Sequence, residues 1–431
     1  MTVVLLFVLL VLGLPVGVAF ALVVMGNAKA WNIELEGIAA LPFDNISNFP
    51  LLAIPLFLLG GELMNRGGLI TQLTAVCDAF MRWARAPLGH VMVIASALMG
   101  AITGSSVATV AAIGGTVGPQ MVARGYPRGY TAALNASAGL LGVLIPPSIP
   151  LILYGSIVGV SITQLFMASV APGLVMMVIF LVLHAFLSRR VLPDGQEQVT
   201  HADGTMSSAA LAPPAARRGV VLRAVPALLL PILVLGGIYS GVFTPTEAAA
   251  VAALYALVIT LLGRTTQFGD LTGIFVRAAV ASASILVIIA FTGIFNRAMV
   301  LEQIPQTIAT FATDFTESPL VFLLVVNAVL LVIGMFMETN AATLLMGPLL
   351  APAAQRYGID PVHFAIILVT NIELGLLTPP MAANLYVAAR ANNADIMSMM
   401  RYLGWFVAGA FLAMAVITYV PQLSLWYRFF L

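Results

Sequence analysis

Long apolar runs, separated by short polar turns, extend along most of the chain. Most of these runs approach or exceed the roughly 20 residues that an α-helix needs to cross a hydrocarbon core of about 30 Å. The pattern therefore predicts an all-α polytopic membrane protein. The runs that we interpret as membrane helices are 2–25, 51–66, 129–160, 163–187, 220–243, 246–263, 275–297, 361–390 and 402–421.

Two further apolar runs, 88–123 and 318–357, differ from the others because they are rich in Gly, Ala, Ser, Thr and Pro. A polar break interrupts each run in its middle, at Gly104-Ser105-Ser106 and at Glu338-Thr339-Asn340. A turn at membrane depth is tolerated only where protein or a water-filled cavity covers it. We therefore predict that each run is a re-entrant helical hairpin with the polar break at its tip.

The two halves of the chain repeat each other weakly at an offset of 233 residues. Residues 142–147 read GVLIPP and match 375–380, which read GLLTPP, and Pro119 likewise matches Pro352. Each half then contains a hairpin followed by a helix that a Pro-Pro pair breaks. The single span left between the halves, 220–243, would give the second half the opposite topology. Inverted repeats with broken helices are typical of secondary transporters, so we predict an ion-transporter fold of this kind.

These patterns divide the chain into three parts. The first repeat, 1–187, contains scaffold helices, a hairpin at about 88–123 and a broken helix at about 129–160. The second repeat, 246–431, contains a hairpin at about 318–357 and a broken helix at about 361–390. Between them, 188–245 is a polar loop plus a connecting helix. Arginines flank the loop, Ser188–Arg223, and the excess of positive charge on cytoplasmic loops of membrane proteins places it in the cytoplasm.

Composition narrows the class of protein further. Hydrophobic residues make up 61% of the 431 residues, charged residues make up 8%, and the mean hydropathy is +1.06. A soluble domain is about 25% charged, and a porin-like barrel alternates polar and apolar residues, so both are excluded. The net charge of +1 provides no basic surface for nucleic acid. One cysteine and four scattered histidines offer no spacing for zinc or haem.

The Pro-Pro pairs indicate ion binding. A proline inside a helix removes an N–H donor and frees the carbonyl of the preceding turn. A freed carbonyl is costly in a membrane unless it finds a partner. Na⁺ is one such partner, because carbonyl and hydroxyl oxygens are hard ligands. Hairpin tips supply helix N-termini and hydroxyl groups, which suit a carboxylate.

We accordingly predict two Na⁺ sites and a substrate site at the hairpin tips and the Pro-Pro breaks. The first Na⁺ site comprises Ser106, Thr109, Ile145, Pro146 and Pro147. The second Na⁺ site comprises Glu338, Thr339, Thr378, Pro379 and Pro380. The predicted substrate-binding residues are Ser105, Ser106, Thr339, Asn340 and Asn384.

The small-residue run 104–109 has a second interpretation, because such runs also let membrane helices pack closely without a ligand. We favour a functional interpretation because two equivalent runs occur and a Pro-Pro break follows each of them. Two carboxylates also lie at membrane depth, where they are costly and usually functional. Glu338 would bind a cation or act in gating. Glu373 would either cap a helix end or touch the transport site.

Five motifs together resemble a known family: GSSVATVAAIGG (104–115), RGY (124–126), IPPSIPLILYG (145–155), METNAATLLMGPLLAP (337–352) and LGLLTPPMAANLYVA (374–388). The chain is similar over essentially its whole length to the large membrane subunit of tripartite ATP-independent periplasmic (TRAP) transporters. This resemblance implies Na⁺-coupled uptake of an organic acid anion, such as a C4-dicarboxylate or sialic acid, by an elevator mechanism in the bacterial cytoplasmic membrane. It also implies two partners, a periplasmic substrate-binding protein and a small four-helix membrane subunit.

The chain starts directly at the large-subunit sequence, so we expect the small subunit to be a separate protein. A stand-alone Na⁺/divalent-anion symporter or antiporter, which needs no binding protein, is the alternative that the sequence leaves open. An intramembrane enzyme would need a nucleophile with its base, or a metal cluster, and no motif of that kind occurs. A channel would need a repeated filter or a charge ring. We therefore predict a transporter subunit with Na⁺ as coupling ion and no organic cofactor.

Overall fold

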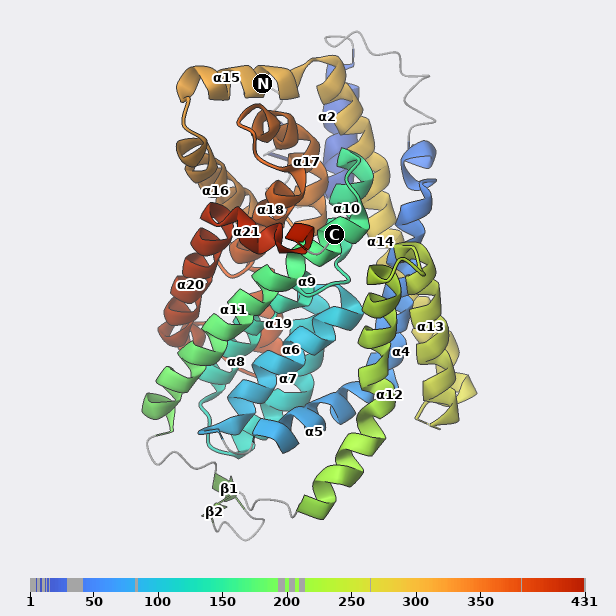
Figure 1. The fold of residues 1–431 in the computed structure, drawn as a ribbon, viewed down its shortest axis with the longest axis vertical. Helices are drawn as coiled ribbons and strands as arrows, with labels where there is room; N and C mark the ends of the chain where they lie inside the picture. The colour runs from blue at the N-terminus through green and yellow to red at the C-terminus, as the bar shows by residue number, and fades with distance from the viewer. Residues whose placement is uncertain are drawn as a thin grey trace.

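The computed structural model describes residues 5, 8, 9, 12, 14, 16–28, 42–81, 84–192, 198–200, 206–208, 214–263, 265–380 and 382–429. Helices make up almost all of this part, so the predicted all-α fold is confirmed. Its strands are β1 (Gln198–Thr200) and β2 (Met206–Ser208), which pair antiparallel within the polar loop at one end of the molecule (Figure 1). We call this end the loop end. Most of the middle of the loop lies outside the described residues.

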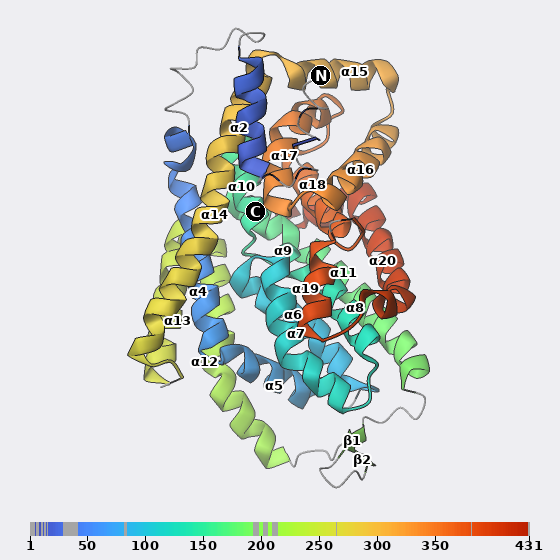
Figure 2. The ribbon, with the colours of Figure 1, turned by 180° about the vertical axis from the view of Figure 1, so that it is seen from behind.

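One side of the molecule is built from five helices, which we call the outer helices. In this group α4 (Ala53–Arg66) packs against α13 (Pro245–Leu262) and α14 (Phe268–Leu301). The helix α12 (Pro214–Tyr239) packs against α13, and α2 (Val16–Asn27) packs against α14 (Figure 2). Of the predicted span 2–25, α2 covers the part that begins at Val16, and most of the remainder lies outside the described residues.

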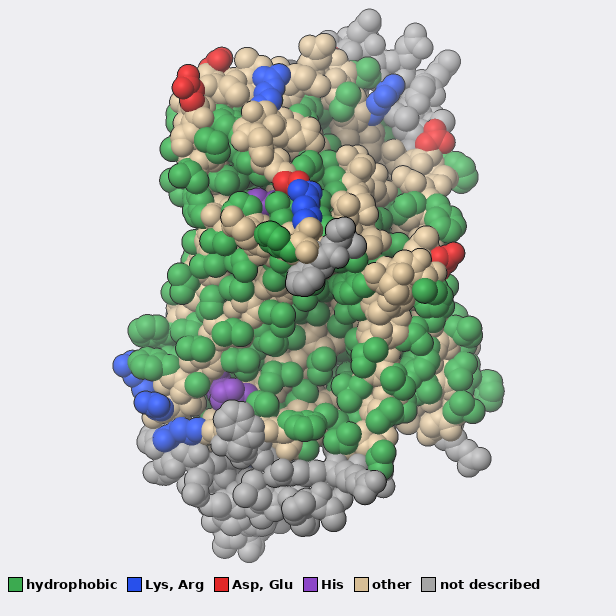
Figure 3. Space-filling view, viewed as in Figure 1, with side chains coloured by type: hydrophobic (Ala, Val, Ile, Leu, Met, Phe, Trp, Pro, Cys, Tyr) green, Lys and Arg blue, Asp and Glu red, His purple; other side chains and the backbone are tan. Residues whose placement is uncertain are grey.

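Seven helices of the described residues are long and apolar enough to cross a membrane. The most apolar part of 128–158 is 94% buried, whereas that of α14 is only 28% buried. The first segment therefore lies inside the protein, and α14 lies at its surface. Figure 3 shows hydrophobic side chains over much of one face, with basic side chains gathered at the end of α11 (Ile162–Val191) beside the loop. This distribution suits a molecule whose sides contact lipid.

Two helix pairs extend toward the middle of the molecule from its opposite ends. The first pair is α6 (Pro87–Thr103) and α7 (Ser106–Ala123), which lies nearer the loop end in both views (Figures 1 and 2). The second pair is α16 (Pro319–Phe336) and α17 (Thr339–Arg356). Each pair is interrupted at the polar break seen in the sequence. The first pair packs closely along its length, whereas α16 packs mainly on α18 and α17 mainly on α15, α10 and α18, so the second pair is more open.

The helix pairs are followed by broken helices. The first consists of α8 (Arg128–Ala138), α9 (Leu141–Leu144) and α10 (Ile149–Val158). The second consists of α18 (Pro361–Gly375) and α19 (Ala383–Ala391). The Pro-Pro pair lies inside the break in both cases, and both Pro-Pro peptide bonds are cis.

Two helices were not predicted from the sequence. The helices α5 (Leu69–Met81) and α15 (Ile304–Phe315) lie across the others at opposite ends of the molecule, each directly before a helix pair (Figure 1). They have 13 and 12 residues, which is too short to cross a bilayer, so a search for apolar spans passes over them. The remaining elements are η1 (Phe49–Leu52), α20 (Ile396–Tyr419), α21 (Pro421–Ser424) and η2 (Trp426–Phe429).

Candidate functional site

The turn between α6 and α7 lies against the break of the first broken helix. Gly104 has a φ of +61°, which favours glycine. Its carbonyl oxygen accepts a hydrogen bond of 3.2 Å from the backbone N–H of Ile149. A Cβ at Gly104 would lie 2.7 Å from the carbonyl oxygen of Pro147, so a larger residue would push the two segments apart. Ser105 then caps α7, because its hydroxyl accepts a hydrogen bond of 3.4 Å from the N–H of Ala108.

The hydroxyl of Thr109 faces the same break one turn further along α7. It is fully buried and lies 3.2 Å from the hydroxyl of Thr103. A Cβ at Gly142 would lie 2.5 Å from Thr109 Oγ1 and 2.8 Å from the carbonyl oxygen of Ser105. Glycine at 142 thus lets the backbone of the broken helix approach the oxygens of the first tip.

The second tip, between α16 and α17, is organised by Glu338. This residue caps α17, because its carboxylate accepts hydrogen bonds from the backbone N–H groups of Asn340 (3.0 Å) and Ala341 (3.3 Å). The side-chain amide of Asn340 donates a further bond of 2.7 Å to the same carboxylate. A carboxylate at a helix N-terminus also interacts favourably with the helix dipole. These bonds fix the direction in which Glu338 faces.

Thr339 connects the second tip to the second broken helix. Its hydroxyl donates a hydrogen bond of 2.8 Å to Oε1 of Glu373, and the exposed fractions of these two residues are 3% and 0%. The end of α16 and the end of α18 approach closely where Gly334 meets Gly375. A Cβ at either glycine would collide with the backbone of the other helix. This contact holds Thr339 beside Glu373.

The two tips face each other across a cavity of about 40 Å³, which we call the central cavity. Two side chains of the outer helices, Leu58 of α4 and Ile285 of α14, form part of its wall. Among the described residues, its acidic residues are Glu338 and Glu373, and no lysine or arginine lines it. The other residues that line it are Gly104, Ser105, Ser106, Val107, Val143, Ile149, Pro150, Thr339, Asn340 and Leu376.

Five predicted site residues therefore lie together: Ser105, Ser106, Glu338, Thr339 and Asn340. The other predicted residues do not line the central cavity. They are Thr109, Ile145, Pro146, Pro147, Thr378, Pro379, Pro380 and Asn384.

These residues outside the central cavity have different surroundings. Pro146 and Pro147 are buried behind the first tip, whereas Pro379 and Pro380 are exposed. Asn384 is fully buried on α19, which packs against α7. Neither polar atom of its side chain has a hydrogen-bond partner among the described residues.

Glu373 is the site residue that the predicted set omitted. It is the acidic residue of an apolar run, and it lies two positions before Gly375 of the repeated GLLTPP motif. That position is also compatible with a helix cap, which is why the sequence did not decide its role. Its Oε2 has no hydrogen-bond partner in the described part of the chain, and neither does Oδ1 of Asn340. Nothing in the sequence singled out Leu58 or Ile285.

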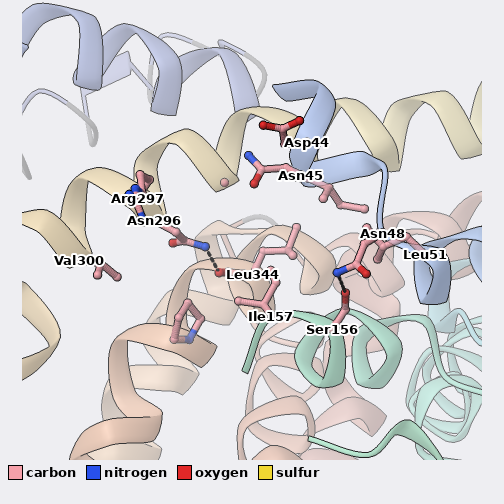
Figure 4. A pocket seen from close by; sticks show the side chains of 13 residues that line it. Asp44, Asn45, Asn48, Leu51, Ser156, Ile157, Asn296, Arg297, Val300 and Leu344 are labelled. Atoms are coloured by element: carbon pink, nitrogen blue, oxygen red, sulfur yellow. Dashed lines mark hydrogen bonds between the residues drawn. The ribbon is translucent and has the colours of Figure 1, made fainter. Parts of the chain in front are cut away.

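Two larger cavities lie on either side of the central cavity. The first, of about 250 Å³, lies nearer the loop end between α4, the first helix pair and α14, and we call it the loop-side cavity. The second, of about 460 Å³, lies between residues 44–51, α10, α14 and α17, and we call it the far-side cavity. Figure 4 shows the polar side chains around it, among them Asn45, Asn48 and Arg297.

A mostly helical molecule with apolar sides, in which two helix pairs and two broken helices meet at a polar centre, has the architecture of a membrane transporter. The sequence agrees with this class. Residues 3–423 match the family described as "Tripartite ATP-independent periplasmic transporter, DctM component". The chain belongs to this family.

Relatives of known name support this assignment. A C4-dicarboxylate TRAP transporter large permease protein of Pseudomonas aeruginosa is 37% identical, over 91% of this chain and 89% of that one. A sialic acid TRAP transporter large permease protein of Vibrio cholerae is 33% identical, over 97% and 95%. An isethionate TRAP transporter permease of Oleidesulfovibrio alaskensis is 36% identical over 97% of this chain. The match spans only 64% of the length of that relative. Because the relatives are permease subunits, this chain is a transporter subunit of the bacterial inner membrane and not an enzyme.

Solved structures with the same fold are also transporters. The YdaH transporter of Alcanivorax borkumensis has a TM-score of 0.63 at 16% identity, over 92% of this chain and 89% of that chain. MtrF of Neisseria gonorrhoeae has a TM-score of 0.58 at 15% identity, over 90% and 85%. At these identities the likeness concerns the fold alone.

Proposed function

We propose that this subunit carries out Na⁺-coupled uptake of an organic acid anion. The observation that carries the proposal is the charge of the central cavity, where Glu338 and Glu373 line the wall and none of the described lysines or arginines does. Two carboxylates in a site of low dielectric constant would repel an anionic substrate. A cation that enters before or together with the substrate removes this repulsion, and the anion can then bind.

Na⁺ suits the oxygens that surround the cavity. Hydroxyl, amide and carboxylate oxygens of Ser106, Thr339, Asn340 and the two glutamates are hard ligands for a monovalent cation. The free Oε2 of Glu373 and the free Oδ1 of Asn340 are available for coordination. We further propose that Ser105, Ser106, Thr339 and Asn340 bind the substrate carboxylate. Because the ion and the substrate share the same tips, the binding of one favours the binding of the other.

The position of the central cavity supports an elevator mechanism. Its polar residues come from the helix pairs and the broken helices, whereas the outer helices contribute only Leu58 and Ile285. Leu58 and Ile285 are apolar and form no side-chain hydrogen bonds across this boundary, whereas the bond from Asn296 of α14 to the carbonyl oxygen of Leu344 on α17 is one that a sliding motion would break. We propose that the tips and broken helices move as one body along α4 and α14, and thereby carry the site from one side of the membrane to the other.

The arginines near the loop end support one orientation of the molecule in the membrane. The last turn of α11 carries Arg189 and Arg190. Arg85 donates a hydrogen bond of 3.3 Å to the carbonyl oxygen of Leu192, just before the loop. We propose that this end faces the cytoplasm, because arginines are more frequent on the cytoplasmic side of membrane proteins. The far-side cavity then opens toward the outside, where a substrate-binding protein would deliver its ligand.

The names of the relatives suggest the substrate class and the partners. Relatives are named for C4-dicarboxylate, sialic acid and isethionate, all of which are organic acids. We propose an organic acid substrate, a periplasmic substrate-binding protein and a small membrane subunit as the partners of this chain. The apolar outer surface of α12, α13 and α14 offers room for the small subunit and for lipid.

Uptake into proteoliposomes tests the proposal. The chain is reconstituted with its small subunit, the binding protein is added outside, and uptake of succinate, isethionate and N-acetylneuraminate is measured. We expect uptake of one of them with an inward Na⁺ gradient and none when choline replaces Na⁺. Equal uptake without Na⁺ would contradict the proposal. Uptake by the chain alone, without the binding protein, would favour the stand-alone symporter instead.

A further inference from the structure

One face of α14 lines all three cavities in turn. Every fourth residue along this face contributes to a wall: Ala281 lines the loop-side cavity, Ile285 the central cavity, and Ile289 and Gly293 the far-side cavity. An arginine marks each end of the face, Arg277 at the loop side and Arg297 at the far side. At a rise of 1.5 Å per residue, the two arginines are about 30 Å apart along the helix.

The two outer cavities share residues at an offset of 231, which is close to the repeat offset of 233. Leu58 and Asn65 line the loop-side cavity, and Ile289 and Asn296, which lie 231 positions later, line the far-side cavity. The next residue is arginine in both cases, Arg66 and Arg297. The two cavities therefore share an aliphatic residue and an asparagine at these positions.

Arg277, the arginine that lines the loop-side cavity, is paired with Glu62. The carboxylate of Glu62 lies 2.5 Å from Nε of Arg277 and 3.6 Å from Nε of Arg66, which is one helical turn away. A cavity whose basic groups are paired in this way provides no free cationic group for an anion.

In the far-side cavity the position 231 residues after Glu62 is Gly293, so no carboxylate lies one turn before Arg297 on α14. Arg297 is exposed and makes no hydrogen bond or ion pair with a described residue. Asp44 also lines the cavity but forms no ion pair with Arg297, and Figure 4 shows their side chains apart. The guanidinium therefore has no partner in the described part of the chain, and it borders a cavity large enough for a small organic acid.

The amide side chains around the far-side cavity are already engaged in holding its walls. Asn296 donates a hydrogen bond of 2.9 Å to the carbonyl oxygen of Leu344 on α17, and Asn45 donates one of 3.2 Å to Ala290. Asn48 donates one of 3.2 Å to the hydroxyl of Ser156 on α10. The walls are thus tied to each other while the guanidinium of Arg297 stays available. Arginine binds carboxylates with two parallel hydrogen bonds.

We propose that the far-side cavity is an anion-capture site, in which Arg297 binds the carboxylate of the incoming organic acid before it reaches the central cavity. The proposal rests on the proposed function, because it assigns a first contact to the substrate of that transport. The proposal also accounts for the direction of transport. The capture site would lie on one side only, since Arg277 in the wall of the loop-side cavity is already paired with Glu62.

The charge of the far-side cavity can be measured without any transport. A single cysteine is placed at Val300, which lines the cavity and is 48% exposed, in a background where Cys77 is replaced by Ala. The full-length chain is reconstituted, and the rates of modification by an anionic and a cationic methanethiosulfonate are compared. We expect Arg297→Gln to lower the ratio of anionic to cationic rates about fivefold, because a positive charge one turn away is removed.

A second pair of variants separates charge from shape. Gly293→Glu places a carboxylate one turn before Arg297, just as Glu62 precedes Arg66, and should lower the ratio as much as Arg297→Gln does. Gly293→Gln has the same size without the charge and displaces the same Asn45 amide, so it should leave the ratio unchanged. An unchanged ratio in both Arg297→Gln and Gly293→Glu would overturn the proposal.

Protection by anions tests the ligand. Succinate, isethionate and N-acetylneuraminate are each tested for slowing the modification of Val300→Cys, with succinamide as the uncharged control. We expect protection by at least one of the anions, none by succinamide, and none in the Arg297→Gln variant. No protection by any of the three, or equal protection in Arg297→Gln, would refute the capture site.

Uptake kinetics connect the capture site to transport. Arg297→Gln should raise KM for the organic acid about tenfold, which corresponds to about 1.4 kcal/mol, with a much smaller change in the maximal rate. An unchanged KM would contradict the capture role. Uptake that does not depend on Na⁺ in the unmodified chain would refute the proposed function instead. The rates at which the cysteine at Val300 is modified would still report on Arg297.

Discussion

Replacing Glu373 by Gln tests whether the central cavity binds a cation. Glu373 is fully buried, and one of its carboxylate oxygens has no partner in the described part of the chain. A cavity of about 40 Å³ places a carboxylate of its wall about 4 Å from a cation at its centre, where two unit charges gain about 4 kcal/mol at an effective dielectric constant of about 20. Because water and the new amide recover part of this energy, we expect Na⁺ binding to weaken about 100- to 1,000-fold.

The assay is the Na⁺ concentration dependence of two properties, uptake and the midpoint of thermal unfolding. A ligand that binds only the folded state raises this midpoint, so added NaCl should stabilise the unmodified chain more than KCl does. Glu373→Gln should lose that difference, whereas Glu317→Gln, at an exposed position, should keep it. If Glu373→Gln kept the Na⁺ half-saturation of the unmodified chain within about threefold, the reasoning would be refuted, because its carboxylate would then contribute no charge to the ion site.

Three further substitutions test the geometry around this site. Gly104→Ala adds a Cβ at 2.7 Å from the carbonyl oxygen of Pro147 and at a φ of +61°. The free energy of unfolding should therefore fall by about 1–3 kcal/mol, which lowers the midpoint of thermal unfolding. Gly375→Ala forces α18 away from α16 and should raise the Na⁺ concentration needed for half-maximal uptake in protein that still folds, as judged by gel filtration. Tyr130→Phe removes the hydrogen bond of 2.6 Å to Nδ1 of His184, which should cost about 1–3 kcal/mol of stability in a thermal melt and leave the Na⁺ dependence unchanged.

The sequence was informative wherever the requirement is local. Crossing a membrane requires a long apolar run, so the predicted span 163–187 lies within α11 and the predicted span 246–263 overlaps α13 almost completely. Polar residues that interrupt such a run must form a turn or a cap. The breaks at 104–106 and 338–340 accordingly coincide with the ends of the paired helices. The short crosswise helices α5 and α15 escaped prediction because their length does not distinguish them from loops in an apolar chain.

The sequence also singled out several residues that line the central cavity, but it could not say which segments meet. Ser106, Glu338 and Thr339 were chosen because they lie at breaks. That they face one cavity depends on close contacts between distant segments, such as Gly104 against Pro147. The predicted residue Asn384 lies away from that cavity for the same reason, since the direction of α19 is set by its packing against α7.

The overall class of this protein, a helical membrane transporter subunit, was determined by its sequence alone, because hydrophobicity and helix breaks are properties of single segments. The chemistry of its centre was decided by the tertiary structure. Glu373 became a site residue only because Thr339, 34 positions earlier in the chain, donates a hydrogen bond to it. Likewise, only folding brings Arg297 of α14 into one cavity wall with residues of α10 and α17. Electrostatic energy depends on distance in space, and folding sets that distance.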